Sequence, residues 1–197
     1  MKNYPRIYSL STLGLIHHYE NDYLFHNMRT DFVGDSGSGK SIIADLLQLI
    51  FVGSEMFESA TRTMDEKREL DGLVLRTPHK GIDIGYAFLN IEIQSRHYIV
   101  IGCYLESNSK RTKPFIIQGS SDPKANLLPI GQPLQTKDFK REGNICPLDD
   151  LLSQMEEKGL SSEQDCFCPI GRRLNPITGF FTLTIFYRSI WLPMKKR

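Results

Sequence analysis

The most informative segment of the chain reads Gly34-Asp35-Ser36-Gly37-Ser38-Gly39-Lys40-Ser41. It fills every fixed position of the pattern G-x-x-x-x-G-K-[ST], which is typical of a phosphate-binding loop that leads into a helix. Glycines permit backbone conformations in which successive N–H groups point into one concavity, where they can hold phosphate oxygens. In such a loop Lys40 places a positive charge near the β- and γ-phosphates, and the Ser41 hydroxyl coordinates Mg²⁺. The segment therefore predicts ATP and Mg²⁺ as ligands of residues 34–41.

The sequence on either side of this segment matches the structural context that the motif needs. Residues 40–52 are apolar apart from Ser41, Asp45 and Gln48 and the leading lysine, which predicts a helix that is covered on most sides and ends at Gly53. Residues 28–33 predict a short strand that runs directly into Gly34. A strand, a loop and a helix in this order favour a phosphate-binding loop over a Gly/Ser-rich linker.

The N-terminal part of the chain predicts strands. Residues 6–15 are rich in Ile, Tyr, Leu and Thr and predict the first strand. Residues 17–22 are polar and predict a turn, after which residues 23–25 pair back on the first strand. The histidines of this region are interpreted as exposed turn residues, although they could approach a nucleotide base: His17, His18 and His26.

The remainder of the chain predicts an antiparallel hairpin and one more helix. Residues 54–81 are polar and predict a surface segment, whereas 86–105 contain two β-type runs around a polar break and predict a hairpin. Residues 114–118 add a further strand. The region 119–165 is predicted as a Pro-, Gly- and Ser-rich loop followed by a short amphipathic helix at 148–158.

The tail at 166–197 fits this pattern poorly. It combines several Pro and Gly residues with an apolar aromatic run and ends in Lys195-Lys196-Arg197. One interpretation is a buried final strand. A second is that the tail is not native sequence because of an upstream frameshift, which the nucleotide sequence of the gene would test.

With these elements in place, residues 1–53 resemble the N-terminal lobe of ABC-type ATPase heads, in particular the SMC, RecN and SbcC-like DNA-associated ATPases. The family's loop usually reads G-x-N-G-S-G-K-S, and Ser36 stands here in place of the Asn. The resemblance implies an α/β P-loop NTPase fold in which residues 1–118 form the lobe and the hairpin forms its antiparallel β-subdomain. It also implies that Gly37, Ser38, Gly39, Lys40 and Ser41 contact phosphate or Mg²⁺, and it places Gln118 near the family's Q-loop glutamine, a metal ligand.

The resemblance further implies partners. Such heads dimerise around two nucleotides and act on DNA through a coiled coil that separates the N-terminal lobe from a C-terminal lobe. The chain departs from the family where hydrolysis needs acidic residues at the end of an apolar strand. Glu106 follows the second arm of the hairpin, Asp149 and Asp150 open a helix, and residues 160–164 lack the glycines of the family signature. The catalytic residues are therefore unassigned, and ATP hydrolysis is expected only if a missing C-terminal lobe completes a truncated or frameshifted head.

Composition restricts the other function classes. The 197 residues are 40% hydrophobic and 24% charged with a net charge of +1, which is typical of a soluble globular protein without a global attraction to polyanions. No apolar run is long enough to span a bilayer and no signal peptide is recognisable, so a cytoplasmic location without a membrane partner is expected. Three functions remain open: an SMC-like ATPase segment in DNA repair, chromosome maintenance or defence, a small P-loop kinase or nucleotide transferase, and a module or remnant that binds nucleotide without hydrolysing it.

Overall fold

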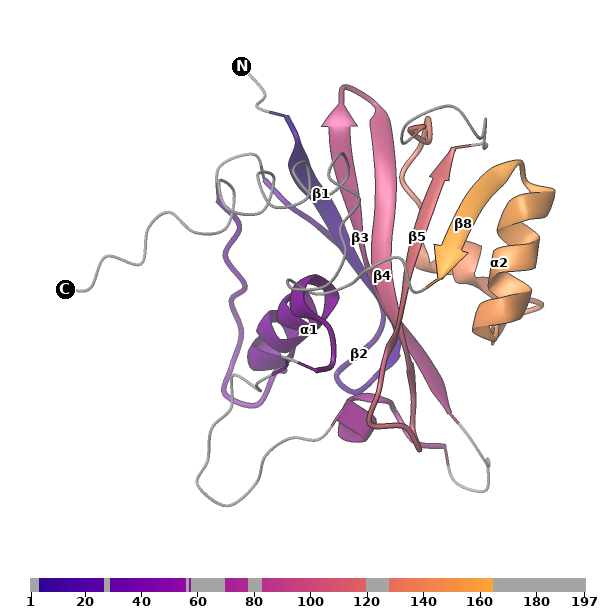
Figure 1. Ribbon diagram of the computed structural model, residues 1–197. Helices are drawn as coiled ribbons and strands as arrows, with labels where there is room; N and C mark the ends of the chain where they lie inside the picture. Colours follow the sequence, from indigo (N-terminus) through magenta and orange to yellow (C-terminus); the bar gives the residue numbers. More distant parts are fainter. Residues whose placement is uncertain are drawn as a thin grey trace.

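The computed structural model describes residues 4–26, 29–55, 57, 70–77, 83–119 and 128–164. These residues form an α/β fold in which one antiparallel sheet of six strands, in the order β2-β1-β3-β4-β5-β8, carries a helix on each face (Figure 1). The strands are β1 (Arg6–Leu15), β2 (His18–Leu24), β3 (Ile84–Gln94), β4 (His97–Glu106), β5 (Lys113–Gly119) and β8 (Leu160–Gln164). The helices are α1 (Lys40–Val52) and α2 (Leu148–Glu157). The predicted tail at 166–197 lies outside the described residues.

The predictions for the first strand, the hairpin and the strand at 114–118 are confirmed by β1, by β3 with β4, and by β5. Strand β3 pairs with β4 along its whole length, and the turn between them lies at Ser95 and Arg96. The strands are buried on both faces, so nearly every residue of the hairpin can be apolar.

The prediction of a turn at 17–22 is wrong. Strand β2 begins at His18 and pairs with β1 from the register Leu15↔His18 to Ser9↔Leu24, so only Ile16 and His17 form the turn. The polar composition that suggested a turn has another cause. Strand β2 stands at the edge of the sheet, where most of its side chains are exposed or half-buried and polar residues carry no burial cost.

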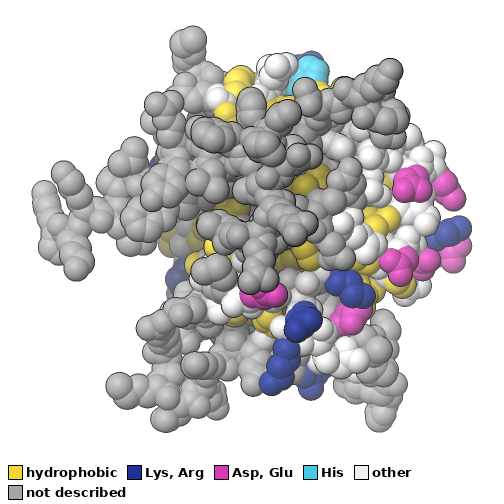
Figure 2. All heavy atoms as spheres, viewed as in Figure 1, with side chains coloured by type: hydrophobic (Ala, Val, Ile, Leu, Met, Phe, Trp, Pro, Cys, Tyr) yellow, Lys and Arg dark blue, Asp and Glu magenta, His cyan; other side chains and the backbone are white. Residues whose placement is uncertain are grey.

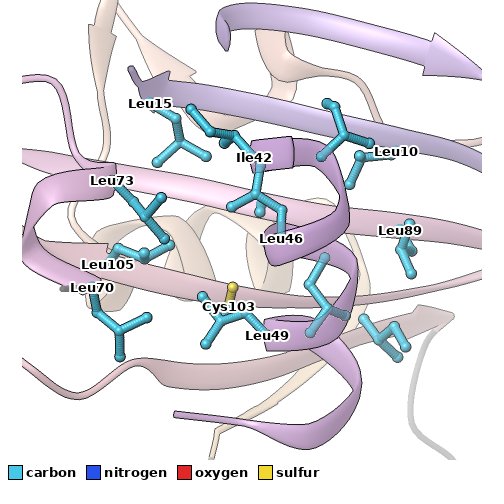
Figure 3. Close-up of a cluster of buried hydrophobic side chains, with 14 of the residues drawn as sticks. Leu10, Leu15, Ile42, Leu46, Leu49, Leu70, Leu73, Leu89, Cys103 and Leu105 are labelled. Atoms are coloured by element: carbon cyan, nitrogen blue, oxygen red, sulfur yellow. The ribbon is translucent and has the colours of Figure 1, made fainter. Parts of the chain in front are cut away.

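Helix α1 begins and ends at the predicted residues and lies on one face of the sheet (Figure 3). Its buried side chains pack against alternate residues of the strands, among them Leu10, Leu89 and Cys103. A short 3₁₀ helix (Leu70–Leu73) closes one side of this cluster, and Leu70, Leu73 and Val74 are buried there. The prediction that residues 54–81 form a surface segment, partly helical, is therefore wrong in its exposure for Leu70, Leu73 and Val74.

The prediction of a strand at 28–33 is wrong for the described residues 29–33, which belong to no strand. Arg29 and Asp31 pair with each other in solvent, and the Val33 side chain is 93% exposed. Only Phe32 packs inward, against Tyr23 and Phe25. A segment with one inward-facing apolar residue gains too little burial to add a strand to the sheet.

The other face of the sheet is covered by α2 and by a second 3₁₀ helix (Thr136–Phe139). The amphipathic helix predicted at 148–158 is confirmed, with Leu148, Leu151, Leu152 and Met155 buried. Two short strands, β6 (Lys140–Arg141) and β7 (Asn144–Ile145), form a hairpin between the two helices. Strand β8 then returns to pair with β5, so the region after 128 belongs to the same sheet and core as the strands before it.

Candidate functional site

Residues 34–41, here called the 34–41 loop, connect the extended segment 29–33 to α1. Ser36 and Gly37 form a turn, and the helix begins at Lys40. Six of the eight residues of the 34–41 loop are exposed to solvent, whereas Gly39 is buried and Ser41 is half-buried. The structure therefore brings all the predicted loop residues together at one exposed site at the start of α1.

Two glycines of the 34–41 loop hold conformations that other residues adopt with strain. Gly37 has φ 84° and Gly39 has φ 85°, both in the left-handed region. A Cβ on Gly37 would meet nothing within 4 Å, so the requirement for glycine there is conformational. Gly39 is constrained twice, because a Cβ would also lie 2.7 Å from Nε2 of His18.

The Lys40 ammonium group lies over the 34–41 loop. Its Nζ donates to the carbonyl oxygens of Gly34 and Asp35, at 2.6 Å in each case, and to Oγ of Ser38 at 3.3 Å. An ammonium group has three protons to donate, and the loop backbone folds around it to accept them. The loop is closed further by the N–H of Ser38, which donates to the carbonyl of Asp35. The positive charge is thereby placed at an exposed loop, where an anion can reach it.

The N-terminus of α1 adds a second source of positive potential. Its N-cap is Gly39, no described side chain caps the helix, and its first turn contains no acidic residue. The N–H groups of a first helical turn have no partner within the helix, and the peptide dipoles of the helix concentrate positive charge at this end. The N–H groups of Lys40 and Ser41 therefore complete a site whose chemistry favours an oxyanion.

Both ends of the 34–41 loop are attached to the β1–β2 hairpin. At the entrance, Phe32 packs edge-on against Tyr23, with ring centroids 5.6 Å apart. At the exit, Nε2 of His18 lies 3.0 Å from the carbonyl oxygen of Gly39, and Nδ1 of the same ring lies 2.7 Å from the Tyr23 hydroxyl. Burial raises the pKa of Tyr23, which keeps its hydroxyl protonated.

The role of His18 was missed at the sequence level, where it is interpreted as an exposed turn residue. Its side chain is buried, and only 6% of the residue is exposed. Its neighbour His17 is exposed as expected. The contact with Gly39 joins residues 21 positions apart, so no local pattern could distinguish the two histidines.

Gln118, the candidate metal ligand, lies elsewhere in the sheet. It is half-buried on β5 in register with Ser161, and its Oε1 has no hydrogen-bond partner among the described residues. It adjoins the sheet row formed by Ser9, Asn90, Val100 and Ile117. That row lies toward the start of β1, whereas His18 and the 34–41 loop lie beyond its end, so the fold of the described residues does not bring Gln118 to the loop.

The acidic residues considered for hydrolysis also lie away from the 34–41 loop. Glu106 ends the second arm of the hairpin and pairs with Lys113. Asp149 and Asp150 occupy the first turn of α2, on the opposite face of the sheet from α1. Most of the acidic side chains visible in Figure 2 gather on the right, where Figure 1 places α2. Residues 160–164, which echo the family signature, form strand β8.

The described residues contain no cluster of three or more His, Cys, Asp or Glu side chains that could hold a metal ion by themselves. None of the helices in the described part of the chain has the length and apolar character needed to cross a membrane.

Comparison of the chain with protein-family models finds no match, and comparison with curated proteins finds none either.

Proposed function

We propose that the 34–41 loop binds the phosphates of ATP together with Mg²⁺. The observation that carries the proposal is the position of Lys40, whose ammonium group lies over a glycine-rich loop at the uncapped N-terminus of a helix of 13 residues. The backbone N–H groups of the loop and of the first turn of α1 would hold phosphate oxygens. Lys40 would turn one or more of its donors toward the β- and γ-phosphates, and the Ser41 hydroxyl would contribute to the coordination of Mg²⁺.

We further propose that the chain is the N-terminal lobe of an ABC-type head similar to the SMC, RecN and SbcC-like ATPases. The antiparallel hairpin of β3 and β4 beside α1 supports this proposal, because the resemblance implies a β-subdomain of that kind. A small P-loop kinase would instead need parallel strands joined by crossover helices. The pairs of the six-stranded sheet are antiparallel throughout the described residues, which favours the head over the kinase.

The proposed activity of this chain by itself is binding without efficient hydrolysis. Glu106, Asp149 and Asp150 lie on other parts of the fold, so none of the three carboxylates considered for hydrolysis lies beside the 34–41 loop. A C-terminal lobe or a second head would have to supply the missing acidic residues. Contact with DNA would then arise through that assembly, because Lys113 of β5 and Lys140 of β6 already pair with Glu106 and Glu20.

The test compares the wild-type chain with Lys40→Ala for MgATP binding by calorimetry and for phosphate release. Lys137→Ala is the matched control, because Lys137 is an exposed lysine on the 3₁₀ helix of the opposite face. We expect Lys40→Ala to lower the affinity for MgATP at least tenfold, about the effect of losing charge-assisted hydrogen bonds worth ~1.5–3 kcal/mol. Lys137→Ala should bind as the wild type does, and turnover should be negligible in all three proteins.

Two results would contradict the proposal in different ways. A folded wild-type chain that does not bind MgATP would refute the assignment of the 34–41 loop and leave a non-functional remnant. Substantial turnover that depends on Lys40 would show that the chain is a complete enzyme with acidic residues of its own.

A further inference from the structure

The His18 ring has a defined arrangement of protons. A carbonyl oxygen only accepts hydrogen bonds, so the 3.0 Å contact between Nε2 of His18 and Gly39 O requires the proton to be on Nε2. In the neutral ring Nδ1 is then an acceptor, and the Tyr23 hydroxyl, 2.7 Å away, is its donor. The contacts thus form a directed chain from Tyr23 O–H to the His18 ring and from His18 Nε2–H to Gly39 O.

This chain ends on the peptide group that joins Gly39 to Lys40. The Gly39 carbonyl also accepts from the N–H of Ile42 at 2.8 Å, so two donors fix its direction. In a trans peptide the carbonyl and the following N–H point in opposite directions. Holding Gly39 O toward His18 and Ile42 therefore points the Lys40 N–H the opposite way, out of the N-terminal end of α1.

The attachment at the other end of the 34–41 loop uses the same tyrosine. Tyr23 packs edge-on against both His18 and Phe32, and Phe32 also contacts Phe25. One side chain of β2 thereby connects the entrance of the loop with its exit. The close approach at the exit needs Gly39, because any Cβ there would clash with the His18 ring and with Cβ of His17.

We infer that His18 is a positioning residue of the nucleotide site: through its hydrogen bond to Gly39 it orients the Lys40 N–H toward the phosphates. This inference rests on the proposed function of the 34–41 loop. The β1–β2 hairpin would then contribute to ligand affinity. A histidine that is merely buried would make no such contribution. His18 acts through the Gly39–Lys40 peptide group and needs no contact with the nucleotide.

The decisive variants are His18→Gln and His18→Asn. A glutamine can place its amide N–H where the histidine carries Nε2–H, whereas an asparagine is too short and can replace only the contact of Nδ1. We expect His18→Asn to weaken MgATP binding about threefold to tenfold, which corresponds to the loss of one hydrogen bond. His18→Gln should bind within about twofold of the wild type by the same criterion. Melting temperatures of both variants, measured without ligand, separate this effect from a loss of folded protein.

Two outcomes would overturn the inference. One is an affinity for MgATP in folded His18→Asn that equals the wild-type value. The other is an equal loss of affinity in both variants, which would indicate that any change at His18 disturbs packing and that the Nε2 hydrogen bond has no special part.

A spectroscopic measurement keeps the inference separate from the proposed function. In the full-length wild type with ¹⁵N-labelled histidine, correlation of ring nitrogens with ring protons reports which nitrogen of His18 carries the proton. We expect Nε2–H, and we expect the amide resonance of Lys40 to shift in His18→Asn and to return in His18→Gln. A proton on Nδ1, or an unshifted Lys40 amide in His18→Asn, would refute the positioning role even if MgATP binds. If these signals are as expected but wild type binds no MgATP, the proposed function has failed and the inferred role in nucleotide binding fails with it.

Discussion

The two faces of the sheet are built from the same strands but are held together differently. On β3, Ala87 and Leu89 face α1, whereas Tyr86 and Phe88 face α2. The fully buried side chains of the α1 cluster are aliphatic apart from Cys103, so most contacts in its interior are non-directional. The α2 face stacks aromatic rings around Phe139 and adds buried hydrogen bonds, such as Tyr86 Oη to the carbonyl of Cys146. The face that carries the candidate site is thus the less specifically packed one.

The buried polar contacts of the α2 face fix one arrangement of its covering segment. Asn90, fully buried on β3, donates to Ser9 Oγ and to the carbonyl of Leu134, and it accepts from the N–H of Leu134. Asp22 accepts from Thr136 and so ties the same segment to β2. Satisfied buried networks of this kind specify a single geometry. The α2 face therefore supplies most of the structural specificity, whereas the α1 face carries the candidate site.

The largest expected effect is that of removing the central ring of the α2 face. Phe139 is fully buried and stacks on Phe88 with centroids 4.1 Å apart. We expect Phe139→Ala to lower the free energy of unfolding by about 3–5 kcal/mol. Urea denaturation of this variant and of Leu49→Ala, its counterpart on the α1 face, measures the difference. A greater loss in Leu49→Ala than in Phe139→Ala would show that the α2 face is not the more specifically packed of the two.

The second effect concerns the polar network of the same face. Asn90→Ala removes three hydrogen bonds and leaves the N–H and the carbonyl of Leu134 without their side-chain partner, so we expect a loss of about 2–3 kcal/mol. Asn144→Ala, which truncates an exposed asparagine, is the matched control and should change stability by less than about 0.5 kcal/mol. Thermal unfolding followed by circular dichroism measures both variants. Equal melting temperatures of Asn90→Ala and Asn144→Ala would show that the hydrogen bonds of Asn90 do not stabilise the fold.

The third prediction concerns how the stability of the α1 face depends on pH. Burial raises the pKa of the Cys103 thiol from its ordinary value of 9.0 to about 12. The unfolded chain therefore loses this proton first, and the stability that the neutral thiol contributes is lost as pH rises from 9 toward 12. Stability should fall by up to about 1.4 kcal/mol per pH unit on account of this group. In Cys103→Ala the slope of urea stability against pH should be shallower by that amount, and identical slopes would contradict the assignment.

The smallest expected effect on stability is that of adding a methyl group to the 34–41 loop at Gly37. Gly37→Ala forces a left-handed conformation on alanine without any clash and should cost about 1 kcal/mol. Gly131→Ala is the control, because a Cβ there also meets open space and the backbone is not left-handed. Differential scanning calorimetry gives the stability of both, and MgATP titration should show weaker binding for Gly37→Ala alone. Equal behaviour of the two variants would show that the conformation of Gly37 is unimportant.

Elements with strong local signals could be predicted from the sequence. Helix α1 was placed at its observed bounds because a dense apolar pattern runs from a Gly-Lys-Ser start to a glycine stop. The β3–β4 hairpin was found because both arms are buried on two faces and therefore read as uninterrupted β-type runs. The residues of the 34–41 loop can be named as a candidate site from the sequence because the motif is local and contiguous, and their role in phosphate binding stays a prediction.

Features that depend on distant partners could not be predicted. Strand β2 is polar because its edge position exposes it, so a strand there looks like a turn. Phe139 belongs to a segment predicted as loop, and it becomes central only when the chain folds back over β3. The pairing of His18 with Gly39 likewise arises only after β1, β2 and α1 are assembled.

The position of α1 in the chain has a consequence for how the protein could tolerate change. In the sheet β1 lies between β2 and β3, yet the whole segment that carries the 34–41 loop and α1 is inserted between Leu24 at the end of β2 and Ile84 at the start of β3. The β1–β2 hairpin before this insertion and the β3–β4 hairpin after it each fix the register of their own strands. Doubling the length of a loop costs only about 0.6 kcal/mol of closure entropy. The outer residues of this insertion can therefore be lengthened, shortened or exchanged at little cost, provided that Phe32 and Gly39 still reach the hairpin. The candidate site is thus the readily graftable part of an otherwise fixed scaffold.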